Sequence, residues 1–466
     1  MYTKYTYQDW KQTPLGERSD MLLRIVDSYK SGDDFKHALT AMQYFSGDNV
    51  EVMKKVILEK RMYEMQGDDG RARTVNLTEP LVGARIPGNF LFRFVTQQNQ
   101  FLLANGVTVE GKPSRDTLGE EFDKVLESMG EKALVQGVCW AFWNVDHAEG
   151  LPAARDARSG FVTLVDEESS MPRLGVQFWQ IDGDRPLYVR LFEEDGVTVY
   201  RKTDKELQVH AEKRAYKVHV NRDAAGETVT GAENYGALPI VPLYANEERR
   251  SELTESIKAK IDAYDRIMSD FVDNFDKANE VYWVLNNFGG STRQMMEMVN
   301  LIRQMNIVAS MPDGMGGNAT AQPHTFEVPF EARRAALELL EKALYQDYMA
   351  LSMDELTGGS LTNVAIQTAM ANLELKCNRY EWQTFRFVQQ LLRLVGVKTE
   401  DIKFSRQTIS NESEVVSDIY TMREDISREK ALDLNPYILA DEVDDILMKR
   451  DKDDLAMDAP DTEDEA

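Results

Sequence analysis

The sequence predicts an α+β fold that is mainly helical, and two patterns support this prediction. Apolar residues recur at steps of three and four over residues 251–278, 330–353 and 363–396, which is the spacing of amphipathic helices. Between residues 160 and 245, apolar and polar side chains alternate in short segments separated by Asp and Gly turns, which is typical of antiparallel strands. A β-rich segment is therefore expected between two helical regions of the chain.

Residues 1–155 are expected to be mainly helical. Helical spacing recurs in four stretches of this region, at residues 21–29, 50–61, 90–105 and 117–145. The last stretch runs into the apolar segment Val138–Trp143. Residues 66–73 are polar and rich in Gly and Asp, which predicts a loop between the second and third helices.

The β-rich region of the chain contains short alternating segments and ends with a proline-containing one. The alternating segments are residues 161–165, 176–181, 187–192, 197–200 and 216–220. Residues 236–244, with the sequence Gly-Ala-Leu-Pro-Ile-Val-Pro-Leu-Tyr, follow them and close this region.

The helices expected after residue 250 are long for a globular protein. Ser251 with Thr254 and Glu255 provides a start for the first, which would be about 42 Å long at about 1.5 Å per residue. The mean helix has only about 11–12 residues. A mixed segment, residues 282–329, separates the first two helices, and a Gly-Gly-Ser break at 356–363 separates the last two. One chain has difficulty covering such helices, so lateral packing between copies is expected.

Charge, cysteine content and hydropathy exclude several classes of protein. The chain has 79 Asp and Glu against 54 Lys and Arg, a net charge of −25, which is opposite to the usual basic DNA reader. Cys139 and Cys377 are the only cysteines, too few for a disulfide scaffold. No apolar run reaches the length of about 18 residues that spans a bilayer, and residues 1–10 lack a secretory signal's apolar core. We therefore expect a soluble intracellular protein.

No motif points to catalysis, a cofactor or a metal. Residues 106–113 resemble a phosphate-binding loop, but Pro113 stands where Ser or Thr should hold magnesium, so a β-turn is the preferred interpretation. The histidines do not pair with a second His or Cys at ligand spacing, and the acidic pairs lack the Gly and Glu of a calcium loop. Cys139 lies in an apolar stretch and is expected to be buried. We expect no enzyme activity, no cofactor and no metal site.

Four stretches of the chain match a known family in order and spacing. They are residues 76–109, 236–246, 252–285 and 357–390. The third is the most specific, whereas in the first Ala104 and Asn105 replace a glycine of the family's turn. Over residues 76–400 the chain resembles the portal proteins, or head-to-tail connectors, of tailed double-stranded DNA bacteriophages of the long-tailed type.

The resemblance implies the phage portal fold, with eight segments in a fixed order. These are a wing at 1–250 (helical over residues 1–155 and β-rich over residues 156–245), a first stem helix at 251–279, a clip at 280–329, a second stem helix at 330–353, a tunnel loop at 354–363, a long wing helix at 364–396, a crown at 397–450 and a disordered acidic tail at 451–466.

The resemblance also implies a function and a set of partners. Twelve copies would form a ring at one capsid vertex, through which double-stranded DNA is packaged and ejected without sequence specificity. The implied protein partners are the terminase large subunit, the scaffold and major capsid proteins, and the head-completion or connector proteins, with no membrane. The chain would lie in the virion, and in the host cytoplasm during assembly.

Three groups of site residues follow from the same resemblance. The DNA-facing tunnel loop would be Thr357, Gly358, Gly359, Ser360, Leu361, Thr362 and Asn363; the lumen-facing stem residues Lys258, Lys260 and Arg266; and the clip docking surface Met311, Pro312, Asp313, Gly314 and Met315. A duplex carries one charge per about 1.7 Å, or about 24 phosphates over a stem of about 40 Å. An acidic subunit with few basic residues would let that duplex slide.

Two other classes of protein stay open. One is a self-assembling structural or scaffold protein without a DNA channel, although the Gly358–Ser360 break would serve no purpose there. The other is a metal-dependent nuclease built on an acidic cluster, which would cleave plasmid DNA with magnesium or manganese.

Overall fold

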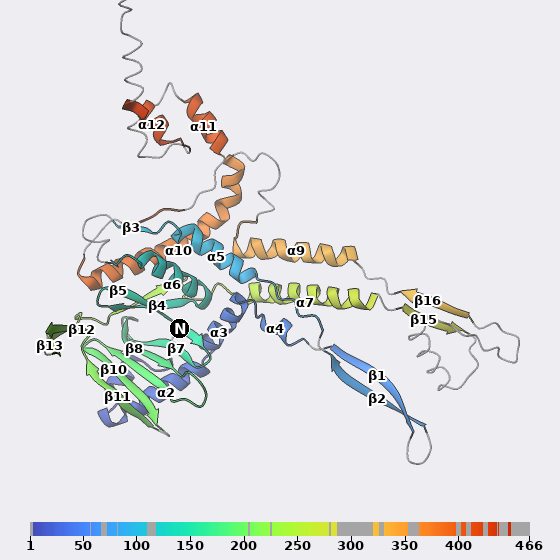
Figure 1. The fold of residues 1–466 in the computed structure, drawn as a ribbon, viewed down its shortest axis with the longest axis horizontal. Helices are drawn as coiled ribbons and strands as arrows, with labels where there is room; N and C mark the ends of the chain where they lie inside the picture. The colour runs from blue at the N-terminus through green and yellow to red at the C-terminus, as the bar shows by residue number, and fades with distance from the viewer. Residues whose placement is uncertain are drawn as a thin grey trace, which may run out of the picture. The chain divides into compact units, whose positions relative to one another are not determined.

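The computed structural model contains both helices and sheets along the chain (Figure 1). It describes residues 3–55, 57–66, 72–81, 83–109, 118–203, 206–223, 226–278, 281–286, 320–325, 330–352, 363–397, 402–406, 412–422, 427–435, 437 and 446–448. Mixed helix and sheet is the predicted fold class, and this prediction is confirmed.

The chain divides into two compact units. The sheet unit consists of Met1–Tyr29, Val95–Arg250 and Met349–Ala466, and the helix-pair unit consists of Lys30–Phe94 and Ser251–Tyr348. Residues 30–94, which were expected to belong to the wing, therefore group with the two long helices.

The centre of the sheet unit is an antiparallel six-stranded sheet in which strands adjacent in sequence pair in space. Its order is β11-β10-β9-β8-β7-β6. The strands are β6 (Ala154–Asp156), β7 (Ser159–Val165), β8 (Pro172–Trp179), β9 (Tyr188–Glu193), β10 (Gly196–Thr203) and β11 (Glu206–Arg214). This meander confirms the strands expected between residues 161 and 200. A separate hairpin joins β12 (Lys217–Asp223) to β13 (Gly226–Glu233).

A three-stranded sheet corrects the prediction for residues 117–145. Helix α6 (Phe122–Gln136) ends at Gly137, whose φ of 90° is the left-handed conformation that glycine adopts at a helix end. Residues 138–144 then form strand β4 (Val138–Asn144) between β14 (Ile240–Tyr244) and β5 (His147–Pro152). The apolar run was mistaken for helix because a strand buried on both faces has no alternation to distinguish it.

The two sheets share one core, and the long C-terminal helix packs in the same unit. The rings of Trp140 and Phe161 are 5.1 Å apart between centroids, with Phe192 in the same cluster. Helix α10 (Asn363–Val395) contacts α5 (Phe90–Leu103) through Tyr380, whose hydroxyl donates to Asn99 Oδ1 at 3.3 Å. Cys139 is fully buried, as expected, and burial raises the pKa of its thiol to about 12.

Shorter elements complete the sheet unit. Strand β3 (Val107–Val109) pairs with β17 (Ile402–Phe404), so residues 107–109 of the stretch 106–113 are extended, whereas residues 110–113 lie outside the described residues. The remaining elements are α1 (Tyr7–Gln12), a 3₁₀ turn (Leu15–Glu17), α2 (Arg18–Ser31, which continues into the other unit), α11 (Glu412–Thr421) and α12 (Arg428–Asp433).

The helix-pair unit is built on α7 (Glu255–Ala278) and α9 (Phe330–Tyr348). Both lie within the expected stretches 251–278 and 330–353. The hairpin of β15 (Val281–Asn286) and β16 (Thr320–Thr325) follows α7 in the chain and precedes α9. Two short helices, α3 (Asp33–Phe45) and α4 (Val50–Met53), also belong to this unit.

The helix predicted over residues 50–61 is wrong after Met53. There the chain forms a long hairpin of β1 (Ile57–Gln66) and β2 (Ala72–Leu81), with Ile57 opposite Leu81 and Gln66 opposite Ala72. Of the predicted polar loop at 66–73, residues 67–71 lie outside the described residues, whereas Gln66, Ala72 and Arg73 belong to the two strands. The apolar spacing of residues 50–61 suggested a helix. Strand formation, however, depends on the segment with which a strand pairs, and here that segment is residues 72–81.

Candidate functional site

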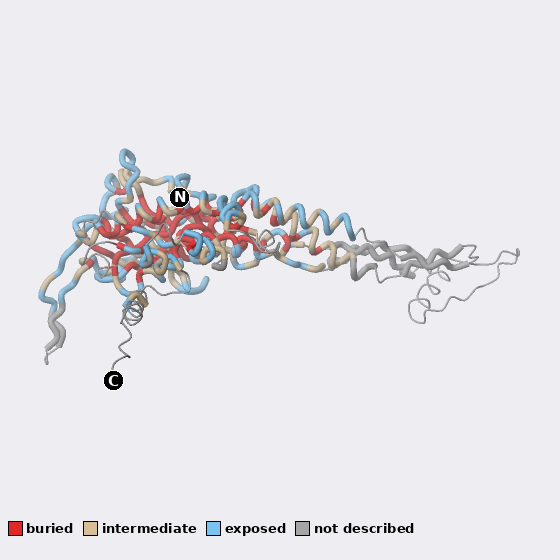
Figure 2. The backbone as a smooth tube through the Cα atoms, turned by 90° about the horizontal axis from the view of Figure 1, so that it is seen from above, coloured by how far each residue is buried: buried red, intermediate tan, exposed pale blue. Residues whose placement is uncertain are grey.

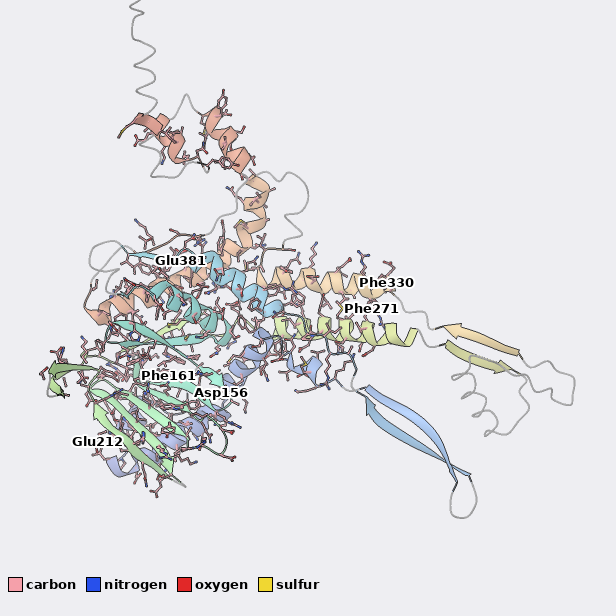
Figure 3. The ribbon with its side chains drawn as sticks, viewed as in Figure 1. Asp156, Phe161, Glu212, Phe271, Phe330 and Glu381 are labelled. Atoms are coloured by element: carbon pink, nitrogen blue, oxygen red, sulfur yellow. The ribbon has the colours of Figure 1, made fainter. Side chains whose placement is uncertain are left out.

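The two long helices form an antiparallel pair, whose contacts can be followed from end to end. Phe271 of α7 and Phe330 of α9 face each other with ring centroids 5.4 Å apart (Figure 3). At the opposite end Ser256 Oγ donates to Asp347 Oδ2 at 3.1 Å. The start of α7 is capped as expected, because Thr254 Oγ1 accepts from the backbone N–H of Ile257 at 3.3 Å.

One face of α7 carries a stripe of polar side chains. Asp262, Asp265, Ser269 and Asp273 follow one another at steps of three and four residues, so they lie along a single line on the helix. Asp265 and Ser269 have no exposed surface at all. Buried polar groups of this kind require hydrogen-bond partners, because leaving one unpaired costs about 1–3 kcal/mol.

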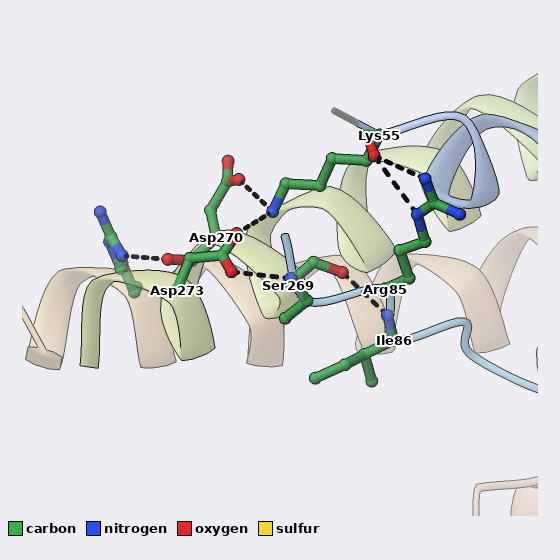
Figure 4. A network of polar contacts seen from close by, with 8 residues as sticks. Lys55, Arg85, Ile86, Ser269, Asp270 and Asp273 are labelled. Carbon is green, nitrogen blue, oxygen red and sulfur yellow. Dashed lines mark hydrogen bonds and ion pairs between the residues drawn. The ribbon is translucent and has the colours of Figure 1, made fainter. Parts of the chain in front are cut away.

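The partners are alternate backbone N–H groups of an extended segment, residues 84–88. Ala84 N–H donates to Asp273 Oδ1 at 2.7 Å, Ile86 N–H to Ser269 Oγ at 3.0 Å and Gly88 N–H to Asp265 Oδ1 at 2.7 Å. Figure 4 shows the Ile86 and Asp273 contacts at close range. We call these three hydrogen bonds the ladder.

The ladder keeps register because two different repeats nearly coincide. Two residues of extended chain advance by about 6.6 Å. Four residues of α-helix advance by about 6.0 Å. Side chains at positions 265, 269 and 273 of the helix therefore meet every second N–H of the segment, which runs antiparallel to α7. The segment is thus attached to the first long helix through its backbone rather than through its side chains.

Three further side chains extend the ladder. Asn49 Nδ2 donates to Asp265 Oδ2 at 2.5 Å, and Tyr44 donates its hydroxyl to Asp262. Lys55 Nζ lies 2.7 Å from Asp270 and 2.6 Å from Asp273. Burial alone would lower the pKa of Lys55, but the hydrogen bonds to these two carboxylates outweigh it and raise the pKa.

Burial dominates the electrostatics of Asp265. It raises the pKa of this carboxyl to about 6, against the opposing effect of the hydrogen bonds from Asn49 and Gly88. The nearby charge of Asp262 raises it further. Asp265, which accepts the hydrogen bond from Gly88, is therefore expected to change its protonation state at a pH of about 6.

Two of the three candidate lumen-facing residues are paired within the helix-pair unit. Lys258 Nζ lies 2.8 Å from Asp262 and above the ring of Tyr44, and Lys260 is ion-paired with Asp347. Arg266 is exposed in the single chain.

Most of the other candidate site residues lie outside the described residues. This applies to Thr357–Thr362 of the tunnel loop and to the whole clip surface, Met311–Met315. Asn363 is the first residue of α10, and its backbone N–H donates to Glu414 Oε2 at 2.5 Å.

The ladder was not predicted from the sequence. Its signal there is the polar spacing of positions 262, 265, 269 and 273, which lies beside the apolar stripe of α7 and to which the sequence analysis assigns no role. Among the described residues, no group of three or more His, Cys, Asp or Glu is placed to hold a metal ion. None of the described helices is long and apolar enough to cross a bilayer.

Comparison with known proteins relates this chain to two phage proteins. The chain is 23% identical over 393 residues to the portal protein of Clostridium phage phiCD119, covering 81% of this chain and 84% of the relative. It is 25% identical over 372 residues to the portal protein of Bacillus phage SPP1, covering 74% and 71%.

A solved structure and a family description complete the comparison. A chain from the structure titled "Neck of native GTA particle computed with C12 symmetry" gives a TM-score of 0.40 at 10% identity, covering 74% of this chain and 89% of that one. That likeness is too weak to support statements about this chain. The match to the family, in contrast, extends over residues 29–454, which is most of the sequence. The chain belongs to the family described as phage portal protein, SPP1 Gp6-like.

Proposed function

We propose that twelve copies of this chain form a ring at one capsid vertex and that double-stranded DNA passes through it during packaging and ejection. The observation that carries the proposal is the incomplete covering of the helix pair. Along α9 only Leu344 and Tyr348 are buried, whereas Leu339 is 70% exposed and Phe330 is 49% exposed. Figure 2 shows most of α9 in tan and pale blue. Neighbouring copies in a ring would cover them.

The segments of the proposed ring are assigned by analogy with the family. Residues 251–279 and 330–353 would be the stem and residues 280–329 the clip, where the terminase large subunit docks before the head-completion or connector proteins replace it. Residues 354–363 would be the tunnel loop, 364–396 the long wing helix and 397–450 the crown. The scaffold and major capsid proteins would contact the outside of the ring, in the host cytoplasm during assembly and later in the virion.

The acidic charge suits a conduit better than a clamp. A net charge of −25 per chain gives DNA little to bind, and Lys258 and Lys260 are already paired with Asp262 and Asp347. Arg266, which is exposed, is the remaining candidate for the channel wall. Weak contacts would allow a duplex to slide past.

Negative-stain electron microscopy combined with native mass measurement tests the proposal. Rings of twelve subunits with a central hole are expected. A closed dimer or tetramer without a channel, or a chain that stays monomeric at raised concentration with scaffold protein present, would contradict it.

A matched pair of variants tests whether the helix pair carries assembly. Leu339→Asp should prevent ring formation without lowering the unfolding temperature of the monomer, because this side chain is 70% exposed there. Ile181→Asp is the control, since Ile181 is 82% exposed but lies in the sheet unit. Equal assembly of the two variants would argue against lateral packing through α9.

A further inference from the structure

We propose that a basic cavity on one face of the six-stranded sheet binds the acidic segment of residues 451–466 of this chain. The cavity lies within the sheet unit, between α6 and strands β5 to β9, and has a volume of about 420 Å³. Ligand pockets usually have volumes of about 300–1,000 Å³. The inference goes beyond the proposed ring and does not depend on it, because the cavity and the segment belong to the same chain.

Three basic side chains line the cavity, and they come from three different elements. Lys132 belongs to α6, Arg155 to β6 and Arg190 to β9. Among the described residues that line the cavity, none is an Asp or a Glu. In a chain whose acidic residues outnumber the basic ones by 79 to 54, three cations without an acid mark a site suited to an anion.

The backbone holds two of these basic residues side by side. Gln136, one helical turn after Lys132, is buried and bonds to both backbone groups of Ala154: its Nε2 donates to Ala154 O at 2.8 Å, and its Oε1 accepts from Ala154 N–H at 2.9 Å. Arg155 follows at a point where the register between β6 and β7 shifts. Such irregularities re-aim a side chain. Helix α6 and strand β6 are thereby fixed to each other at the edge of the cavity.

Arg190 is held in place by aromatic rings rather than by a carboxylate. Its guanidinium lies 5.4 Å from the ring centroid of Trp179 and 6.0 Å from that of Phe192. With the described residues it forms no ion pair and no side-chain hydrogen bond. Glu149 acts on it only from farther away and accepts a hydrogen bond from Asn144 at 2.7 Å.

A bound anion would therefore stabilise Arg190. The side chain is half-buried, and burial lowers the pKa of its guanidinium. A charge removed from water is costly unless an opposite charge or hydrogen bonds compensate it. The rings fix the position of the guanidinium in advance, so that little further ordering is needed when a carboxylate binds.

The pleat of the sheet explains why the cavity has an apolar floor. Successive side chains of a strand point to opposite faces, and the two neighbours of Arg190 are buried on the other face. On the face of Arg190, the three-stranded sheet covers Phe161 (labelled in Figure 3), whose ring centroid lies 5.1 Å from that of Trp140. Trp179 is only partly covered. Leu151, Phe161 and Trp179 line the cavity, so a ligand meets apolar as well as basic groups.

Residues 451–466 match both properties of the cavity. They contain eight Asp or Glu against one Lys. Within them, residues 453–458, with the sequence Asp-Asp-Leu-Ala-Met-Asp, place three apolar side chains between carboxylates. The carboxylates would pair with the basic groups, and the apolar side chains would contact the floor. The segment itself lies outside the described residues.

Covalent attachment favours this segment over a separate anion. A ligand joined to its site by a short linker has an effective concentration in the millimolar range. At about 3.3 Å per residue, the segment can extend up to about 53 Å, toward the cavity of its own copy or of a neighbouring one. A DNA phosphate is the competing anion, but the phosphate backbone offers no apolar side chain to the floor.

Carbodiimide coupling of the full-length chain tests the proposal without any substitution. The reagent joins an amine directly to an adjacent carboxylate, and Lys132 supplies the amine. We expect mass spectrometry to find Lys132 linked to an Asp or Glu of residues 451–466, and a link within one copy or between copies supports the proposal equally. Lys124 is the matched control, because it is exposed on the same helix but does not line the cavity. It should form far fewer links to the segment.

Arginine variants test whether the basic groups hold the segment. Arg190→Gln removes one charge from the cavity and leaves Lys132 in place, so most of the Lys132 link should be lost. Arg155→Gln is a second variant at an exposed position, where folding is not at risk, and it should also reduce the link. Arg393→Gln is the control, because it removes the same charge from an exposed position of α10 outside the cavity. It should retain the link.

Three outcomes would overturn the proposal: no Lys132 link to the segment, equal links from Lys124 and Lys132, or a link that both cavity variants retain. Weaker binding of duplex DNA by Arg190→Gln in a filter assay, together with no Lys132 link, would assign the cavity to phosphate instead. None of these experiments needs assembled rings. A chain that forms no rings can still show the link, and rings can form without it, so the two proposals fail separately.

Discussion

The backbone N–H of Gly88 donates a 2.7 Å hydrogen bond to Oδ1 of Asp265, a carboxylate with no exposed surface. This contact is one of three by which an extended segment is attached to the first long helix. The close approach also explains why residue 88 is a glycine. A Cβ at this position would lie 2.8 Å from the ring of Phe90 and 2.9 Å from Asp265 Oδ1. At this point of the ladder a side chain on residue 88 would collide with Phe90 and Asp265.

Gly88→Ala should therefore lower the free energy of unfolding by about 1–3 kcal/mol, the usual cost of forcing a group into a packed site. Urea denaturation of the purified chain measures it. Gly16→Ala is the control, because a Cβ at Gly16 meets nothing within 4 Å. If the two alanine variants are equally stable, the close approach at Gly88 is not a packing constraint.

Ser269→Ala removes the middle rung of the ladder. The N–H of Ile86 then loses its acceptor at a position where Ser269 has no exposed surface, so we expect a loss of about 1–3 kcal/mol. Ser256→Ala, at an exposed position of the same helix, should cost far less. Amide hydrogen exchange gives a more local readout: exchange at Ile86 should accelerate in Ser269→Ala. Unchanged protection there would mean that the hydrogen bond does not hold the segment.

The raised pKa of Asp265 has a definite consequence for stability. Its carboxyl titrates at about 6 in the folded chain against about 3.8 when unfolded, so the folded state binds the proton more tightly. The contribution of this group is complete below the unfolded pKa and is lost as pH rises through about 6. Asn49 and the N–H of Gly88 face the carboxyl, and Asp262 adds a like charge nearby.

The measurement is the free energy of unfolding between pH 4 and pH 7 for the wild type and for Asp265→Asn. Relative to the variant, which has no proton to lose at this position, the wild type should lose stability as the pH rises. Parallel curves for the two proteins would show that Asp265 is not titrating in this range.

The sequence predicted those elements whose pattern is local. The apolar periods of α7, α9 and α10 are repeated within each helix, and the alternation of β7 to β10 lies within each strand, so both could be read without knowing the fold. Strand β1 was missed because its formation depends on the segment with which it pairs, and β4 was missed because its buried run has no alternation.

The ladder was missed for a related reason. Gly88 and Asp265 are 177 residues apart, and the donors of the segment are backbone N–H groups, which every residue except proline possesses. The side chains of residues 84–88 therefore could not predict these hydrogen bonds. Only the acceptor side chains, at positions 265, 269 and 273 of α7, can be recognised in the sequence, by their spacing of four residues.

The proposed tunnel loop gives a prediction about DNA movement that is separate from assembly. Gly358→Pro combined with Gly359→Pro restricts the backbone of residues 354–363, because each proline fixes φ near about −65°. If this loop must change conformation as DNA passes, the double variant should form normal rings yet fail to package DNA into proheads. Gly358→Ala with Gly359→Ala, which changes the same positions without locking φ, should retain much more packaging. Normal packaging by the proline variant would exclude a moving or gripping role for this loop, while loss of rings in both variants would assign these glycines to assembly instead.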